Sequence, residues 1–147
     1  MSNVQYLGMA CALGLSALGS GFGAGAACSA AVGGWKKCYA NGKPAPFILV
    51  AFGGVPLTQT IYGFLLMTFI KNALVRSNPI DPMLGLGVGL FGGLAIGLSA
   101  WMQGICAAHA CDAFAETGKG TANYFMVIGI IETVALFTLV FSLLMLG

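Results

Sequence analysis

The sequence has 147 residues, of which 59% are hydrophobic and only 7% are charged, and its formal net charge is +2. A soluble domain carries about 25% charged residues, so this composition excludes an ordinary soluble protein and is typical of a membrane protein. Because the net charge is small and no stripe of basic residues is present, the sequence also excludes a nucleic-acid-binding surface.

Charged residues divide the chain into four long apolar runs. The runs are residues 1–35, 44–70, 82–111 and 120–147. Glu132 is the single charged residue within them, and a helix that spans a bilayer needs about 20 apolar residues. The sequence therefore predicts an all-α membrane protein with four transmembrane helices and loops near 36–46, 71–81 and 112–122. Since the first run is too long for a signal peptide and lacks a basic start, we expect it to be retained.

Glycines gather in the first and third predicted helices. The segments GSGFGAGAA (19–27) and GLGVGLFGGLAIG (85–97) contain overlapping G-x-x-x-G pairs. In lipid, small residues let helix backbones approach closely, so packing replaces the absent hydrophobic drive. We expect these two helices to form an inner layer and the bulkier second and fourth helices to form an outer layer. Residues 87–92 also match G-x-G-x-x-G, but they lie inside an apolar helix, so the sequence predicts no nucleotide site on this chain.

The chain contains an internal repeat. LGLSALGSGFGAGAAC (13–28) matches IGLSAWMQGICAAHAC (96–111) at eight of sixteen positions, and QTIYGF (59–64) aligns with ETVALF (132–137). The sequence therefore predicts two tandem helical hairpins, residues 1–76 and 77–147, related as parallel repeats. Gln59 stands at the repeat position of Glu132, so only the second hairpin carries the acid.

The basic residues predict how the chain crosses the membrane. Four of the six lie in or beside the first and third predicted loops, and they are Lys36, Lys37, Lys43 and Lys119. Because cytoplasmic loops carry an excess of lysine and arginine, we expect these two loops to be cytoplasmic. Both termini and the loop with Lys71 and Arg76 would then lie outside the cell membrane.

Glu132 is the centre of a group of polar residues at one depth. A charge at the bilayer centre costs about 2.5–3.5 kcal/mol on the insertion scale, so an ionisable residue there is by default a functional hypothesis. Glu132, Gln103 and Gln59 lie at similar distances along their helices from the flanking loops, which predicts a common level. The structural alternative is a permanently protonated glutamate that only links two helices.

Further oxygen atoms are expected beside these three side chains. Thr58 adjoins Gln59, and Tyr62 lies three residues further on the same helix face. Pro56 removes a helical hydrogen bond and restrains Val55, which allows nearby carbonyls to turn away from the helix. A set of oxygen ligands alone suits a hard cation or a proton rather than copper, zinc or iron.

These features resemble the proteolipid subunit, called K or c, of the rotor ring of V-type rotary ATPases. The resemblance covers nearly the whole chain, including the duplicated hairpin, the glycine-rich helices, the repeated GLSA, and one glutamate opposite a glutamine. The segments PLTQTIYG (56–63) and IIET (130–133), with Gln103, are similar to those of bacterial sodium-translocating members. The resemblance implies that Na⁺ is bound by the carbonyl of Val55 and the side chains of Thr58, Gln59, Gln103 and Glu132. Tyr62 would donate a hydrogen bond to Glu132.

The resemblance also implies partners and a mechanism. Identical subunits would form a two-layered homo-oligomeric ring in the plasma membrane, surrounded by lipid. The ring would turn against a stator membrane subunit bearing an arginine and would contact central-stalk subunits of a soluble head. The ATP site would lie on that head, so this chain would be a non-catalytic carrier of ions, coupled to ATP hydrolysis or synthesis.

Three other functions remain open from the sequence. A proton-translocating ring of the same type needs only a shielded carboxyl, so the number of oxygen ligands separates it from a sodium ring. A small secondary transporter or channel would need a water-lined path and typically more than one intramembrane charge. An assembly proteolipid without transport would not need Glu132.

Overall fold

The computed structural model describes residues 3–147, and all regular elements of these residues are helical. The elements are α1 (Asn3–Ala40), α2 (Ile48–Gly54), the 3₁₀ helix η1 (Val55–Leu57), α3 (Thr58–Val75), α4 (Pro82–Thr117) and α5 (Thr121–Leu146). Because α2, η1 and α3 follow one another without a break, they form one span, residues 48–75. The predicted all-α fold is confirmed, with four helices long and apolar enough to cross a membrane.

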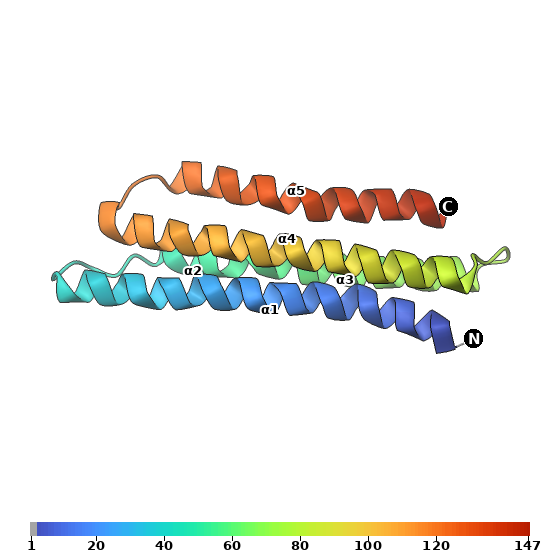
Figure 1. The fold of residues 1–147 in the computed structure, drawn as a ribbon. Helices are drawn as coiled ribbons and strands as arrows, with labels where there is room; N and C mark the ends of the chain where they lie inside the picture. The colour runs from blue at the N-terminus through green and yellow to red at the C-terminus, as the bar shows by residue number, and fades with distance from the viewer. Residues whose placement is uncertain (1–2) are drawn as a thin grey trace.

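The helices lie along one common axis (Figure 1). In Figure 1, α4 lies between α5 and α1, and α2 and α3 lie behind them. The start of α1, the end of α5 and the linker 76–81 lie at one end of the bundle, and the linkers 41–47 and 118–120 lie at the other. Each hairpin therefore crosses the bundle and returns.

The tightest packing in the bundle joins α1 to α4. A Cβ atom built on Gly19 would lie 1.9 Å from the carbonyl oxygen of Gly97, and one built on Gly104 would lie 2.1 Å from the Cα of Gly23. No side chain fits at these distances, so the two backbones are in direct contact. This is the close approach that small residues allow in lipid, and it pairs the two glycine-rich helices.

The helices extend further than the charge-free runs predict. α1 continues through Lys36 and Lys37 to Ala40, and α4 continues through Asp112 to Thr117, so the predicted loops 36–46 and 112–122 are too long. The linker predicted at 71–81 likewise begins only at residue 76. At 38 residues, α1 is about 57 Å long, which exceeds the bilayer thickness of about 45 Å.

Charged side chains at the projecting ends of α1 and α4 pair with one another. Lys37 Nζ lies 2.9 Å from Asp112 Oδ1 and 2.6 Å from Glu116 Oε1, and all three side chains are exposed. Because these charged side chains are exposed and paired, the helices continue through them. Charged residues therefore do not mark the helix ends here.

Candidate ion-binding site

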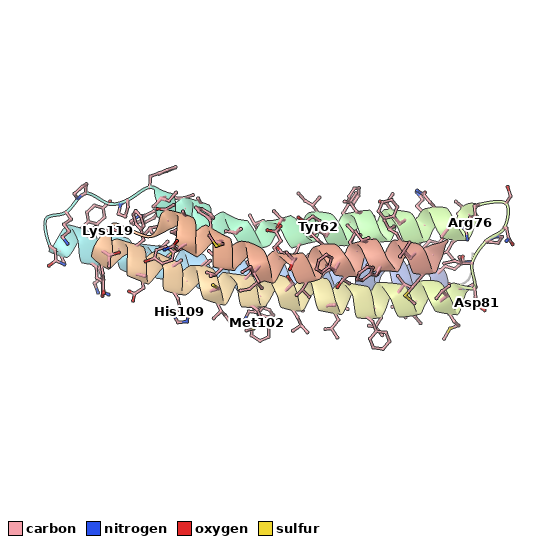
Figure 2. All side chains as sticks on the ribbon, turned by 90° about the horizontal axis from the view of Figure 1, so that it is seen from above. Tyr62, Arg76, Asp81, Met102, His109 and Lys119 are labelled. Atoms are coloured by element: carbon pink, nitrogen blue, oxygen red, sulfur yellow. The ribbon has the colours of Figure 1, made fainter. Side chains whose placement is uncertain are left out.

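The polar residues singled out in the sequence meet in the middle part of the bundle, between α3, α4 and α5. Figure 2 shows Tyr62 in this part, with Lys119 towards one end and Arg76 and Asp81 at the other. Glu132 of α5 is the only acidic side chain of the four apolar runs, and it is partly buried here. The structure brings all six predicted residues into one hydrogen-bonded group.

Three side chains donate hydrogen bonds to the Glu132 carboxylate. Oε1 accepts from Thr58 Oγ1 and from the Tyr62 hydroxyl, each at 2.8 Å. Oε2 accepts from Gln103 Nε2 at 3.2 Å. Hydrogen bonds to an ionised acceptor are stronger than neutral ones, so these donors compensate for the water that Glu132 lacks. The carboxylate is thereby held between α3 and α4.

The site includes two fully buried amide side chains. Gln59 and Gln103 are both 0% exposed, and Gln59 Nε2 donates to Gln103 Oε1 at 2.8 Å. Gln103 Nε2 also donates to the backbone oxygen of Ile128, at 3.2 Å. Gln103 therefore directs its nitrogen to Glu132 and its oxygen to Gln59, whereas the resemblance implied that its oxygen binds the ion.

Several oxygen atoms gather around Thr58. Its Oγ1 lies 2.8 Å from Glu132 Oε1, 3.0 Å from Gln59 Oε1 and 3.1 Å from the backbone oxygen of Val55. A hydroxyl has one proton to donate, so it satisfies one of these three acceptors at a time. All three oxygens nevertheless lie within 3.1 Å of Thr58 Oγ1, and a cluster of oxygen atoms this close suits a hard cation.

The 3₁₀ segment explains why a backbone oxygen belongs to this cluster. Pro56 lacks an N–H group, so the regular helical pattern is interrupted between α2 and α3. Within η1 the carbonyl of Val55 accepts from the backbone N–H of Thr58 and lies within reach of the Thr58 hydroxyl. The Pro56 kink expected from the sequence thus places the Val55 oxygen beside the side chains of α3.

One polar contact beside the site was missed in the sequence. Ser99 Oγ on α4 donates to the backbone oxygen of Ile131 at 2.9 Å, directly before Glu132. The available signal was spacing, because Ser99 lies four residues before Gln103 and so shares its helix face. Within residues 3–147, no group of three His, Cys, Asp or Glu side chains could hold a metal ion.

Comparison with known proteins relates the chain to ATP synthases. Residues 86–145 match the family of the ATP synthase C subunit. The chain is also 35% identical over 143 residues to the A-type ATP synthase subunit K of Methanocaldococcus jannaschii. That alignment covers 95% of this chain and 60% of the relative, so the chain spans less than two thirds of the relative's length.

Proposed function

We propose that the protein is a rotor-ring subunit of a V-type ATPase or ATP synthase. This proposal is supported by the match of residues 86–145 to the family of the ATP synthase C subunit and by the 35% identity over 143 residues to an A-type ATP synthase subunit K. In this role it carries Na⁺ across the membrane at Glu132. The observation that supports the sodium assignment is the oxygen cluster around Thr58, in which oxygens of Val55, Gln59 and Glu132 lie 3.1, 3.0 and 2.8 Å from the Thr58 hydroxyl.

Four oxygens of this cluster serve as sodium ligands in the proposal, and they come from Val55, Thr58, Gln59 and Glu132. A fifth comes from Gln103 if its amide turns, so that the oxygen replaces the nitrogen facing Glu132. Tyr62 is not a ligand, and its hydroxyl holds the carboxylate in place. Five oxygens already held by packed helices can replace much of the water around a sodium ion.

The proposed transport step follows from the cost of a buried charge. A bare carboxylate inside lipid is unfavourable, whereas a carboxylate with a bound cation is neutral. As the ring turns, each Glu132 therefore passes the surrounding lipid with a cation bound. At the stator, an arginine replaces this cation, which is then released. A membrane potential contributes about 2.3 kcal/mol per charge per 100 mV. ATP is bound and hydrolysed by other subunits, so this chain is not itself an enzyme.

The competing proposal is a proton-translocating ring. It is compatible with the three side chains around Glu132, because they shield the carboxyl group and a proton needs no set of oxygen ligands. The sodium proposal remains preferable because a proton site gains nothing from the two fully buried amides. A small secondary transporter or an assembly proteolipid is less compatible with a single intramembrane acid bound by three side chains.

Carbodiimide labelling of Glu132 tests the sodium proposal, since this reagent attacks the protonated acid. We expect millimolar sodium at neutral pH to slow labelling of the purified protein, while potassium at the same ionic strength does not. Because a proton and sodium compete for the same carboxylate, protection should weaken as the pH falls. Labelling that is unchanged by sodium would favour the proton ring.

A further inference from the structure

Two side chains of α4 donate hydrogen bonds to two backbone oxygens of α5 that lie about one helical turn apart. Ser99 Oγ donates to the oxygen of Ile131, and Gln103 Nε2 donates to the oxygen of Ile128. Ser99 and Gln103 lie four residues apart and share one face of α4. Ile131 directly precedes Glu132, and the Ile128 oxygen lies one turn before it. The two bonds therefore fix the segment of α5 that carries the acid.

The Ser99 bond is shielded from solvent. Ser99 is 4% exposed, so its hydroxyl has no access to bulk water as an alternative partner. A carbonyl oxygen has two lone pairs, so Ile131 can accept from Ser99 and keep its helical hydrogen bond. The bond thus adds an attachment between the two helices without breaking α5.

Beyond this attachment, α5 is less closely packed on α4. A groove of about 450 Å³ lies between the two helices, and its lining includes Gly87 and Phe91 of α4 and Phe141 and Met145 of α5. Within residues 3–147, the hydrogen bonds between α4 and α5 are made by Ser99 and Gln103 alone. Ala135 and Leu139 of α5 are also buried in the apolar core. Because apolar burial is non-directional, the polar bonds near Glu132 add the specific constraint on the rotation of α5.

The equivalent serine of the first hairpin behaves differently. Ser16, the repeat partner of Ser99, donates to the oxygen of Ala12 in its own helix at 2.7 Å, and its hydroxyl also lies 3.5 Å from the backbone oxygen of Gly93 in α4. There α1 and α3 touch directly, since a Cβ atom built on Gly63 would lie 2.4 Å from the Cβ of Ser16. Of the two serines, Ser99 thus hydrogen-bonds to the other helix of its own hairpin, and Ser16 does not. Since that hairpin carries the acid, the contact is linked to the site rather than to the shared repeat.

From these contacts we propose that Ser99 is a positioning residue for Glu132. Its bond to Ile131 fixes the position of α5 along its axis and its rotation relative to α4. The Glu132 carboxylate can then accept hydrogen bonds from Thr58, Tyr62 and Gln103 at the same time. The inference rests on the proposed function, because an ion carrier must return its carboxylate to the same donors after each release. It holds for either sodium or protons, since both require that return.

The test compares Ser99→Ala with Ser16→Ala and Ser99→Thr in the purified, assembled full-length protein. Two quantities are measured: the carbodiimide labelling rate of Glu132 without sodium, and the sodium concentration that halves the rate. Ser99→Ala should label about threefold faster or more, because the carboxylate leaves its donors. It should also need about five times more sodium for half-protection, as expected for one lost hydrogen bond. Ser16→Ala should behave like the wild type in both measurements.

The variants separate the possible outcomes. Ser99→Thr keeps the hydroxyl, so it should match the wild type, and behaviour like Ser99→Ala would assign the effect to packing and overturn the proposal. Equal results for Ser99→Ala and Ser16→Ala would overturn it as well. If sodium fails to protect even the wild type, the sodium function is wrong, but faster sodium-free labelling of Ser99→Ala alone would still support the positioning role.

Discussion

The two oxygens of Glu132 have unequal surroundings. Oε1 receives two hydroxyl donors at 2.8 Å, whereas Oε2 receives one amide donor at 3.2 Å. Oε1 also lies beside the oxygens around Thr58, so an ion bound among these oxygens would contact Oε1 rather than Oε2. Small changes at Thr58 and Glu132 therefore test the site more directly than changes elsewhere in the bundle.

Replacing Glu132 with glutamine should abolish ion transport and leave assembly intact. The amide has nearly the volume of the acid, but it has no charge to offset a cation, and its single oxygen cannot accept both from Thr58 and Tyr62 on one side and from Gln103 on the other. ATP-driven uptake of radioactive sodium into vesicles that contain the whole complex should fall to background. Glu116→Gln is the matched control, since Glu116 is exposed and pairs with Lys37. A mutant that still pumps at a sizeable fraction of the wild-type rate would refute the assignment.

Thr58→Ala should weaken sodium binding without removing the labelled acid. The change deletes one ligand oxygen and one donor to the carboxylate, and hydrogen bonds to charged groups contribute about 1.5–3 kcal/mol. The sodium concentration for half-protection should therefore rise at least about tenfold. Thr68→Ala on the same helix is the control, because the Thr68 hydroxyl donates to Phe64 of its own helix. Equal protection in the two variants would exclude Thr58 as a ligand.

The residues of the site could be predicted from the sequence, but their orientation could not. Polar side chains are rare in the apolar runs, so Gln59, Gln103 and Glu132 stand out by type and by depth. The two ends of an amide have nearly the same size, so the sequence does not say that Gln103 turns its nitrogen towards Glu132. Ser99 is small and common in helices, and its role depends on the rotation of α5 against α4.

For single elements, glycines rather than charges mark where helices end. Gly42 and Gly118 follow α1 and α4 and have φ values of 62° and 65°, a left-handed conformation that glycine adopts at low cost. The predicted loop boundaries were wrong because they were placed at charged residues, and α1 and α4 continue past these residues. The interruption at Pro56 was predictable, since a missing N–H acts on the backbone wherever it occurs.

Gly19→Ala should destabilise the contact between α1 and α4. Its new methyl group would lie 1.9 Å from the Gly97 backbone oxygen, which cannot move aside as a flexible side chain can. Overpacking typically costs about 1–3 kcal/mol, so the thermal midpoint in detergent should fall by several degrees. Gly129→Ala on α5 is the control, because nothing lies within 4 Å of its Cβ position. A Gly19→Ala midpoint at or above that of the control would contradict the observed packing.

For the whole molecule, the projecting ends of α1 and α4 should face the cytoplasm. The linkers at this end carry Lys43 and Lys119, and the opposite linker, residues 76–81, carries Arg76. In a background without the five native cysteines, a cysteine at Asn78 should react with an impermeant maleimide on intact cells. A cysteine at Asn41 should react only after lysis. The reverse pattern would invert the topology.

Ring assembly should depend on glycines that find no partner within one subunit. Nothing lies within 4 Å of the Cβ positions of Gly14, Gly21 and Gly25, although they share the helix that packs most tightly elsewhere. Small residues on an exposed helix face in lipid favour close contact with another helix. In a closed ring, each subunit presents one face to the next subunit and a different face to the previous one. These glycines fit the surface that receives the neighbour.

Gly21→Leu should therefore prevent the ring from closing while each subunit still folds. The leucine side chain would hold the neighbouring helix away from α1, and within the subunit it meets open space, so the helix content by circular dichroism should stay unchanged. Native mass spectrometry from mild detergent should show smaller assemblies or single subunits. Gly129→Leu is the matched control, since Gly129 is equally open but lies on α5, in the expected outer layer. Intact rings for Gly21→Leu, or equal loss in both variants, would show that the α1 glycines do not form the contact between subunits.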